Sequence, residues 1–237
     1  MAVAAATGRD IAQISPAVMD CFAYAVAANG AYLLDNGSGR LIAAHPMEPR
    51  LAAHVVREIL RHGGGPSLFH GGRMAAALRS PLLMPGGSPG AYFKAKRAYC
   101  PHLGLSPLLG LRAGHGADPV YKIQGFFPNP ERSAAAAASL KRRSELAVLD
   151  MGDGTVEVTM AGVTKAAGLG RLCAELGISA AELAAFGDSR NDLEMLQMAG
   201  YAVAMANGAD CVKAAADYIA GDVAEDGAAG AIYDLFR

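Results

Sequence analysis

The sequence predicts an α/β protein with a parallel, Rossmann-like sheet core and an inserted α+β domain. Near both ends of the chain, an apolar run leads into a polar loop and then into a helical pattern, as at residues 183–199. The middle third instead mixes strand patterns with two helical patterns. We therefore expect an α/β core over residues 1–35 and 161–237, and an inserted α+β domain over residues 36–160.

The chain opens with an apolar, strand-like run at residues 2–6 that ends at Thr7 and Gly8. A strand that feeds a Thr-Gly pair presents a hydroxyl and a backbone N–H at the start of the next element, which suits a phosphate oxygen. Thr-Gly is also an ordinary helix cap. The pair alone therefore leaves a phosphate site and a cap both open.

From Asp10 to Ala28 the apolar residues recur at helical spacing, and Val26 is the last of them. Ser15 and Pro16 interrupt the pattern, and we expect them to be the N-cap and first position of a second helical segment. A short strand is expected over residues 31–34. The turn at residues 35–39 that follows is the first candidate domain boundary.

The middle third shows clear elements only on either side of a long irregular stretch. Residues 71–118 are rich in Gly, Pro and Ser, and no periodicity orders them. The polar residues in loops of this domain are candidates for substrate binding and no more, because a lone His or Lys in a loop is more often a solvated surface group. The candidates are His45, His70, Arg73 and Lys94. The expected elements are a helix over 51–60, strands over 67–69 and 120–127, a helix over 131–142, and a hairpin of 146–149 with 155–159.

A helix is predicted to begin at Lys165 and to end at Gly177. A lysine in the first turn has the wrong charge for the helix dipole, so a purely structural lysine is disfavoured there. A bound anion would remove that penalty. Lys165 is therefore a candidate anion-binding residue.

The apolar run at residues 183–186 ends in a loop that carries Asp188, Asn191 and Asp192. Ligands of parallel α/β sheets bind at the carboxyl ends of strands, where strand-end carboxylates and helix N-termini meet. The alternative is an N-cap followed by a solvated first turn. Two carboxylates and an amide within five residues favour a binding site. Further strands are expected at 201–205 and 218–220, with a final helix after 225–227.

Three segments together resemble a known enzyme family. Gly-Asp-Ser-x-Asn-Asp at residues 187–192 resembles the fourth motif of the haloacid dehalogenase (HAD)-like phosphatases. Beside it, Thr7-Gly8-Arg9 resembles the second motif, and Lys165 the third. The inserted domain and the C-terminal segments look like the Cof-type subgroup, which has a class IIB cap. One departure is Ala166, where relatives usually carry Gly.

The resemblance implies a magnesium-dependent phosphatase that hydrolyses a small phosphomonoester, such as a sugar phosphate, through an aspartyl-phosphate. The inserted domain would be the cap that selects the substrate. The implied roles are Mg²⁺ binding by Asp188, phosphate binding by Thr7, Gly8, Lys165 and Asn191, and catalysis by Lys165, Asn191 and Asp192.

The family nucleophile lies in an Asp-x-Asp-Gly-Thr motif at the end of the first, central strand, and these 237 residues do not contain it. The segment from Asp150 to Thr155 is the nearest match, but it has one residue too many between Asp150 and Asp153. A tight hairpin turn explains that segment without chemistry. The resemblance therefore implies a chain that lacks its central strand and its nucleophile, from a late start or a truncation, and that is inactive as given.

Two alternatives stay open beside the phosphatase. The chain could be a catalytically inactive remnant that binds a phosphorylated ligand or a partner, or a phosphomutase of the same fold. Phosphatase activity with upstream residues restored separates the phosphatase from the remnant. Bisphosphate-dependent isomerisation of a sugar phosphate separates the phosphatase from the phosphomutase.

Composition predicts a soluble, cytoplasmic protein, and the family resemblance implies a small phosphorylated metabolite as its partner. The net charge is −1, and the tight basic run at residues 141–143 suits a helix end, so no nucleic acid partner is expected. Although 52% of the residues are apolar, no run reaches the roughly 18 that a membrane helix needs. The cysteines have no Cys-x-x-Cys spacing and are expected to be reduced thiols; they are Cys21, Cys100, Cys173 and Cys211. The sequence leaves the oligomeric state open.

Overall fold

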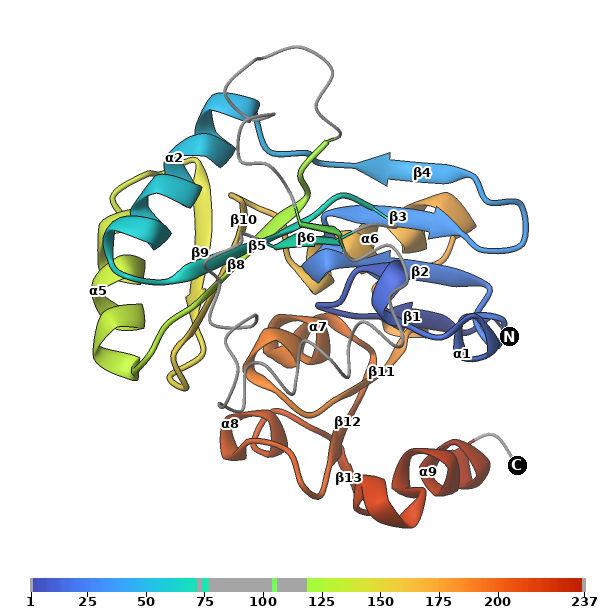
Figure 1. The fold of residues 1–237 in the computed structure, drawn as a ribbon. Helices are drawn as coiled ribbons and strands as arrows, with labels where there is room; N and C mark the ends of the chain where they lie inside the picture. The colour runs from blue at the N-terminus through green and yellow to red at the C-terminus, as the bar shows by residue number, and fades with distance from the viewer. Residues whose placement is uncertain (1, 72–73, 77–103, 106–118, 236–237) are drawn as a thin grey trace. The chain divides into compact units, whose positions relative to one another are not determined.

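A computed structural model describes residues 2–71, 74–76, 104–105 and 119–235 of the chain. The chain divides into two compact units, residues 1–163 and 164–237. Both units combine strands with helices (Figure 1). The predicted positions Arg73, Lys94 and Cys100 lie outside the described residues.

A four-stranded sheet opens the first unit, in the order β1-β2-β3-β4 among the described strands. β1 and β2 are parallel, whereas β2, β3 and β4 are successively antiparallel. The elements are β1 (Ala4–Ala6), η1 (Ile11–Gln13), α1 (Pro16–Met19), β2 (Tyr24–Ala27), η2 (Ala28–Gly30), β3 (Tyr32–Asp35) and β4 (Leu41–Ala44). The predicted opening strand is confirmed. β4 returns along β3 after the predicted turn at residues 35–39.

The helical pattern predicted up to Val26 is wrong in its second half. Ser15 is the N-cap of α1, its Oγ accepting from the Val18 N–H at 3.4 Å, and Pro16 is the first helical residue, as predicted. The helix ends at Met19, and Val26 lies fully buried in β2. There it pairs with Ala6 on one side and with β3 on the other. Hydrogen bonds to a strand on each side satisfy the backbone groups of this segment. The local spacing of apolar residues does not reveal those partners.

A second sheet in the first unit has the order β7-β6-β5-β8-β10-β9 among its described strands. Helices α2 and α5 lie side by side against one face of it (Figure 1). Its core packs Val55 and Ile59 of α2 and Leu140 of α5 against Ile123 and Val158 of the strands. The elements are α2 (Pro49–Arg61), β5 (Gly65–Phe69), β6 (Met74–Ala76), β7 (Gly104–Leu105), β8 (Lys122–Phe126), α5 (Pro130–Leu140), β9 (Leu146–Asp150) and β10 (Thr155–Met160). The two helices predicted in this region are confirmed, and so are the two strands at 67–69 and 120–127 and the hairpin of 146–149 with 155–159.

The structure confirms that the segment from Asp150 to Thr155 is a hairpin turn. β9 and β10 are antiparallel, and Gly152 and Gly154 adopt φ values of 79° and 90°. The Asp150 carboxylate accepts from the Ser133 hydroxyl at 3.1 Å and from the Gly152 N–H at 3.2 Å. The Asp153 carboxylate accepts from the Thr155 N–H at 2.9 Å. Both carboxylates therefore stabilise the turn.

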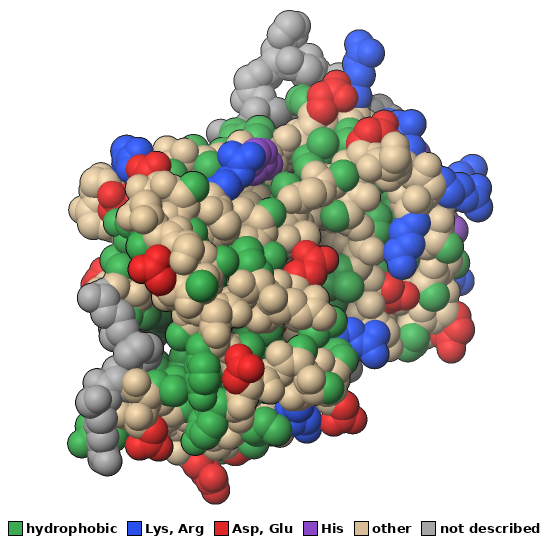
Figure 2. All heavy atoms as spheres, turned by 180° about the vertical axis from the view of Figure 1, so that it is seen from behind, with side chains coloured by type: hydrophobic (Ala, Val, Ile, Leu, Met, Phe, Trp, Pro, Cys, Tyr) green, Lys and Arg blue, Asp and Glu red, His purple; other side chains and the backbone are tan. Residues whose placement is uncertain are grey.

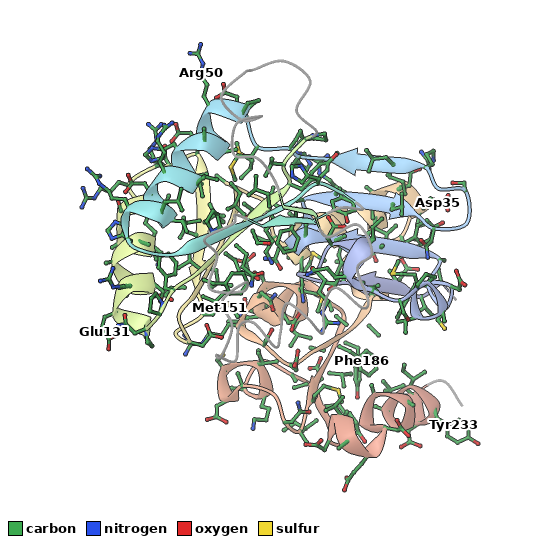
Figure 3. All side chains as sticks on the ribbon, viewed as in Figure 1. Asp35, Arg50, Glu131, Met151, Phe186 and Tyr233 are labelled. Atoms are coloured by element: carbon green, nitrogen blue, oxygen red, sulfur yellow. The ribbon has the colours of Figure 1, made fainter. Side chains whose placement is uncertain are left out.

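The second unit carries a parallel sheet with the order β11-β12-β13 among its described strands. Its elements are α6 (Lys165–Leu176), η4 (Ala180–Glu182), β11 (Ala184–Gly187), η5 (Arg190–Asp192), α7 (Leu193–Met198), β12 (Tyr201–Met205), α8 (Asp210–Lys213), β13 (Tyr218–Ala220), η6 (Val223–Glu225) and α9 (Gly227–Leu235). α6 begins at Lys165 and ends at Gly177 with a φ of 67°, as predicted. Phe186 extends from β11 and packs with Ala231 of α9 against the sheet (Figure 3).

The described surface carries both signs of charge, as the face in Figure 2 shows. None of the helices in the described residues is long and apolar enough to cross a membrane. Cys21, Cys173 and Cys211 are free thiols. The predicted boundaries between core and inserted domain, at residues 35 and 161, stay predictions.

Candidate active site

The loop that follows β11 is organised by Asp192. The Oδ2 atom of Asp192 accepts from the N–H of Asp188 at 3.1 Å and from the N–H of Ser189 at 3.0 Å. The Ser189 hydroxyl also bonds to the side-chain oxygen of Asn191. Asp192 is 3% exposed. One carboxylate thus fixes the backbone of the loop that carries the two other predicted residues, Asp188 and Asn191.

Gly187 makes this arrangement possible because Asp192 lies directly over it. A Cβ atom at position 187 would come within 2.5 Å of the Asp192 Cβ and 3.0 Å of its Cγ. Real Cβ contacts are not that short. The glycine before Asp188 is therefore required by close packing, since Gly187 is not among the residues with positive φ.

Lys165 and Asp192 form a buried ion pair inside the second unit. The Nζ atom of Lys165 lies 2.5 Å from Oδ1 of Asp192, and the lysine is 7% exposed. Thr164 caps α6 through a bond from the Ala167 N–H to its Oγ1 at 3.1 Å. The first residue of α6 is thereby held against the loop after β11, so two motifs far apart in sequence meet.

Asp188 is exposed, and its hydrogen bonds to the described residues are made by its backbone. Its carbonyl accepts from the Ala209 N–H at 2.8 Å, and Gly208 packs so closely that a Cβ there would lie 3.1 Å from the Asp188 Cα. The carboxylate of Asp188 is therefore open to a ligand, while the backbone behind it is fixed.

Asp188 fits a magnesium ion as a single protein ligand. Mg²⁺ in phosphate-transfer sites is bound by one or two carboxylates and keeps waters and substrate oxygens as its other ligands. The Asp192 carboxylate is engaged by protein groups at both oxygens, by Lys165 at Oδ1 and by two loop N–H groups at Oδ2. Among the described residues, no group of three His, Cys, Asp or Glu side chains is placed to hold a metal.

The loop with Thr7 and Gly8 belongs to the first unit and follows β1. The Thr7 Oγ1 atom accepts from the Arg9 N–H at 3.0 Å, which closes a tight turn. The Thr7 carbonyl accepts from the Asn29 N–H at 3.0 Å, and the Gly8 carbonyl accepts from Lys122 Nζ at 2.7 Å. The carbonyl of the next residue, Arg9, accepts from the Ala28 N–H at 2.9 Å. The loop is thus anchored through its carbonyls.

Asp10 ends this loop as a fully buried carboxylate that the sequence did not single out. It accepts from the Gly71 N–H at 2.9 Å and hydrogen-bonds to Tyr32. Burial and the Asp10 charge raise the pKa of Tyr32 above its ordinary range, so the phenol stays protonated and can donate. Burial and Asp10 also raise the pKa of Tyr121, whose ring centroid lies 5.0 Å from that of Tyr32.

Within the second unit, the structure brings together four of the predicted residues, namely Lys165, Asp188, Asn191 and Asp192. Thr7 and Gly8 lie in the first unit. The convergence of Thr7, Lys165, Asp188 and Asn191 on one pocket stays a prediction. Of the cap candidates in the described residues, His45 is half-buried, and His70 contacts the Pro119 carbonyl through Nδ1 at 3.2 Å.

A sequence model of the haloacid dehalogenase-like hydrolases matches residues 1–232. The chain belongs to this family. The family resemblance read from the three motifs is therefore confirmed. The match covers both compact units, so the loop with Thr7 and the loop with Asp188 are parts of one family pattern.

Solved structures show the same fold for this HAD-like chain. A haloacid dehalogenase-like hydrolase from Bacteroides thetaiotaomicron aligns with a TM-score of 0.80 at 22% identity, over 98% of this chain and 86% of its own. A HAD subclass IIB sugar phosphatase aligns with a TM-score of 0.79 at 20% identity, over 99% of this chain and 85% of its own. The predicted α/β fold class is confirmed.

Curated relatives are also similar to the chain at the level of sequence. The 5-amino-6-(5-phospho-D-ribitylamino)uracil phosphatase YcsE of Bacillus subtilis is 41% identical over 93 residues. The aligned part is 39% of this HAD-like chain and 37% of the relative. The match thus spans little more than a third of either protein.

Proposed function

We propose that this HAD-like chain carries the phosphate- and metal-binding parts of a magnesium-dependent phosphatase for a small phosphomonoester. The observation that carries the proposal is the buried pair of Lys165 and Asp192 beside the exposed carboxylate of Asp188. A cation at a helix start and an open carboxylate at a strand end are what a phosphate and a metal ion require together.

The substrate class is proposed from the similar proteins. YcsE is named for a phosphorylated ribitylamino-uracil, and the subclass IIB structure is that of a sugar phosphatase. Both names describe small phosphomonoesters with a polar, sugar-like portion. We infer a substrate of that chemical class for this chain, selected by the inserted α+β domain over residues 36–160.

Each residue has a defined part in the proposed reaction. Thr7, Gly8 and Asn191 donate hydrogen bonds to phosphate oxygens, and Lys165 neutralises phosphate charge. Asp192 holds the Lys165 ammonium and the loop in place. Asp188 would hold Mg²⁺, which when bound supplies positive charge against the phosphate dianion.

The nucleophile is the part that these residues do not supply. In the proposed mechanism a carboxylate attacks phosphorus, and the ester oxygen leaves as an alcohol with a proton from the second Asp of the family motif. That Asp then takes a proton from the water that cleaves the aspartyl-phosphate. The 237 residues contain no Asp-x-Asp-Gly-Thr segment. Asp150 and Asp153 hold a hairpin turn instead. We therefore expect this chain by itself to bind phosphorylated ligands without turning them over.

The test compares two proteins in magnesium-dependent hydrolysis of a panel of sugar phosphates and nucleotide monophosphates. The first is the 237-residue chain, for which we expect no turnover above background. The second is the same chain extended at its N-terminus by a family strand with Asp-x-Asp-Gly-Thr, for which we expect turnover. Loss of a nucleophile costs several powers of ten in rate, so the contrast should be plain.

Two controls make the test decisive. In the extended protein, changing the first Asp of the added motif to Asn and making Asp188→Ala should each abolish turnover. Turnover by the unextended chain that Asp188→Ala abolishes would contradict the proposal that the nucleophile is missing. Phosphate binding by both proteins without turnover by either would favour the phospho-ligand-binding alternative.

A further inference from the structure

One ion pair on the second sheet of the first unit lies outside the hydrophobic core and has no part in the proposed chemistry. Lys122 on β8 and Glu157 on β10 lie on neighbouring strands, with Nζ 2.5 Å from Oε1. Lys122 is 1% exposed. Val156 and Val158, which flank Glu157, pack with α2 and α5, so the pair lies on the opposite face. Burying two charges costs several kcal/mol per ion before their attraction offsets it, so stability alone is a weak reason for the pair.

Both partners of the pair hold segments of the four-stranded sheet. Lys122 Nζ donates to the Gly8 carbonyl at 2.7 Å. Glu157 Oε2 accepts from the Asn29 side-chain amide at 2.7 Å. One ion pair therefore holds two loops at once: the loop with Thr7 and Gly8, and the turn after β2.

The turn after β2 has an unusual backbone. Ala28 and Asn29 have φ values of 51° and 61° without being glycine, and Gly30 follows at 93°. Such conformations cost of order 1–3 kcal/mol each and persist where the surroundings hold them. Here they direct the N–H groups of Ala28 and Asn29 to the carbonyls of Arg9 and Thr7.

This anchoring decides where the Gly8 amide points. In a trans peptide the C=O and the following N–H point in opposite directions. Asn29 holds the Thr7 carbonyl on one side, so the Gly8 N–H points to the other. Within the described residues the Gly8 N–H has no protein partner. In the part of the chain that the structure describes, Thr7 Oγ1 is engaged only as an acceptor from Arg9, so its own hydrogen is available.

We propose that Lys122, Glu157 and Asn29 are positioning residues that hold the Gly8 amide and the Thr7 hydroxyl toward a phosphate group. This inference rests on the proposed function, because it assigns those two donors to phosphate. Lys122 and Glu157 touch the loop from its carbonyl side and do not contact the ligand. Their effect is to fix the direction of the donors before the ligand arrives.

The test uses the full 237-residue chain, inorganic phosphate as the probe, and backbone amide NMR as the readout. Lys122→Met alone would leave Glu157 charged and buried, so the double variant Lys122→Met/Glu157→Gln is used to keep the cluster neutral. We expect the dissociation constant for phosphate, read at the Gly8 amide, to rise about tenfold, as for outer-shell partners of other sites. Without phosphate, the amides of Ala28 and Asn29 should exchange with solvent about tenfold faster.

Glu58→Gln is the matched control, because it removes another buried carboxylate of the same unit, one that bonds to Ser139 and Arg61. A merely structural loss of stability would occur in this variant too, but its phosphate affinity should stay at the wild-type value. Asn29→Ala should reproduce the effect of the double variant in part, since it removes one of the two connections.

A folded double variant with wild-type phosphate affinity and wild-type exchange at Ala28 and Asn29 would overturn the inference. Failure of the proposed function gives a different result, namely a wild-type chain in which phosphate leaves the Gly8 amide unperturbed. In that case the exchange rates still decide whether Lys122 and Glu157 hold the loop. Wild-type exchange rates would contradict that role, and faster exchange would support it.

Discussion

Asp192 shows how much a single carboxylate determines at the residue scale. One oxygen neutralises Lys165, and the other accepts from two N–H groups of the loop that carries Asp188. The family resemblance gave Asp192 a catalytic role, but its ion pair with Lys165 could not be read from spacing. The two residues are 27 positions apart, and only the folding of α6 against the loop brings them together.

Removing Lys165 should therefore destabilise the protein more than removing an exposed lysine. We expect Lys165→Met to lower the free energy of unfolding by about 3 kcal/mol, because the Asp192 charge stays buried without its partner. Lys213→Met is the control, since the partner of Lys213, Asp210, is fully exposed and lies 3.3 Å from its Nζ atom. We expect this change to lower the free energy of unfolding by less than about 1 kcal/mol. Urea denaturation measures both. Equal losses would show that burial does not set the strength of the Lys165 pair.

Gly187 gives a second prediction at this scale. Gly187→Ala should lower the free energy of unfolding by about 1–3 kcal/mol, because the added methyl displaces Asp192 from its bonds. Gly170→Ala in α6 is the matched control, since the nearest described atom outside the helix backbone, the Met198 sulfur, would lie 4.0 Å from the added Cβ. That change should be neutral or stabilise by up to about 1 kcal/mol. A Gly187→Ala protein as stable as wild type would contradict the close packing described at Asp192.

At the scale of elements, α2 and α5 are joined by a hydrogen bond from the Ser139 hydroxyl to Glu58 at 2.8 Å. This bond, with smaller effects from Arg61, His54 and His62, lowers the pKa of Glu58 below its ordinary value of 4.5. A lowered folded-state pKa contributes stability that is fully present above the unfolded-state pKa. The contribution is lost as the pH falls through the folded-state pKa.

Ser139→Ala should therefore lower the free energy of unfolding more at about pH 7 than at about pH 3. At the lower pH a larger fraction of Glu58 is protonated in both proteins, so the charge-assisted bond distinguishes them less. Urea denaturation of wild type and variant at both pH values measures the difference. The control repeats Ser139→Ala in a Glu58→Gln background, where its cost should not depend on pH. A pH-independent cost in both backgrounds would refute the role of Glu58.

Elements with strong local signals were predictable from the sequence, and elements defined by distant partners were not. The hairpin of β9 and β10 and the end of α6 follow from glycines that adopt positive φ. β2 was read as helix because its strand partners β1 and β3 leave no trace in local spacing. Lys122 and Glu157 were missed for a related reason. Each is one charged residue in an apolar strand, and only the pairing of β8 with β10 brings them together.

At the scale of the whole molecule, β1 and β11 each pair on one side only among the described strands of their own sheets. The family arrangement expected from the sequence puts the nucleophile strand between these two strands. That arrangement stays a prediction. If it holds, we expect the Thr7 hydroxyl to lie within roughly 12 Å of the Asp188 carboxylate, because a phosphate–magnesium site is only a few ligand lengths across.

The most direct test of the account is a titration of the 237-residue chain with inorganic phosphate in the presence of Mg²⁺, followed by backbone amide NMR. The proposal under test, which follows the family motifs, is that the loops of Thr7 and Asp188 bind one phosphate–metal group. We expect the amides of Gly8 in the first unit and Ser189 in the second to shift together with one dissociation constant. Asp188→Ala should weaken both responses. Shifts in one unit alone, or two unrelated dissociation constants, would contradict the claim.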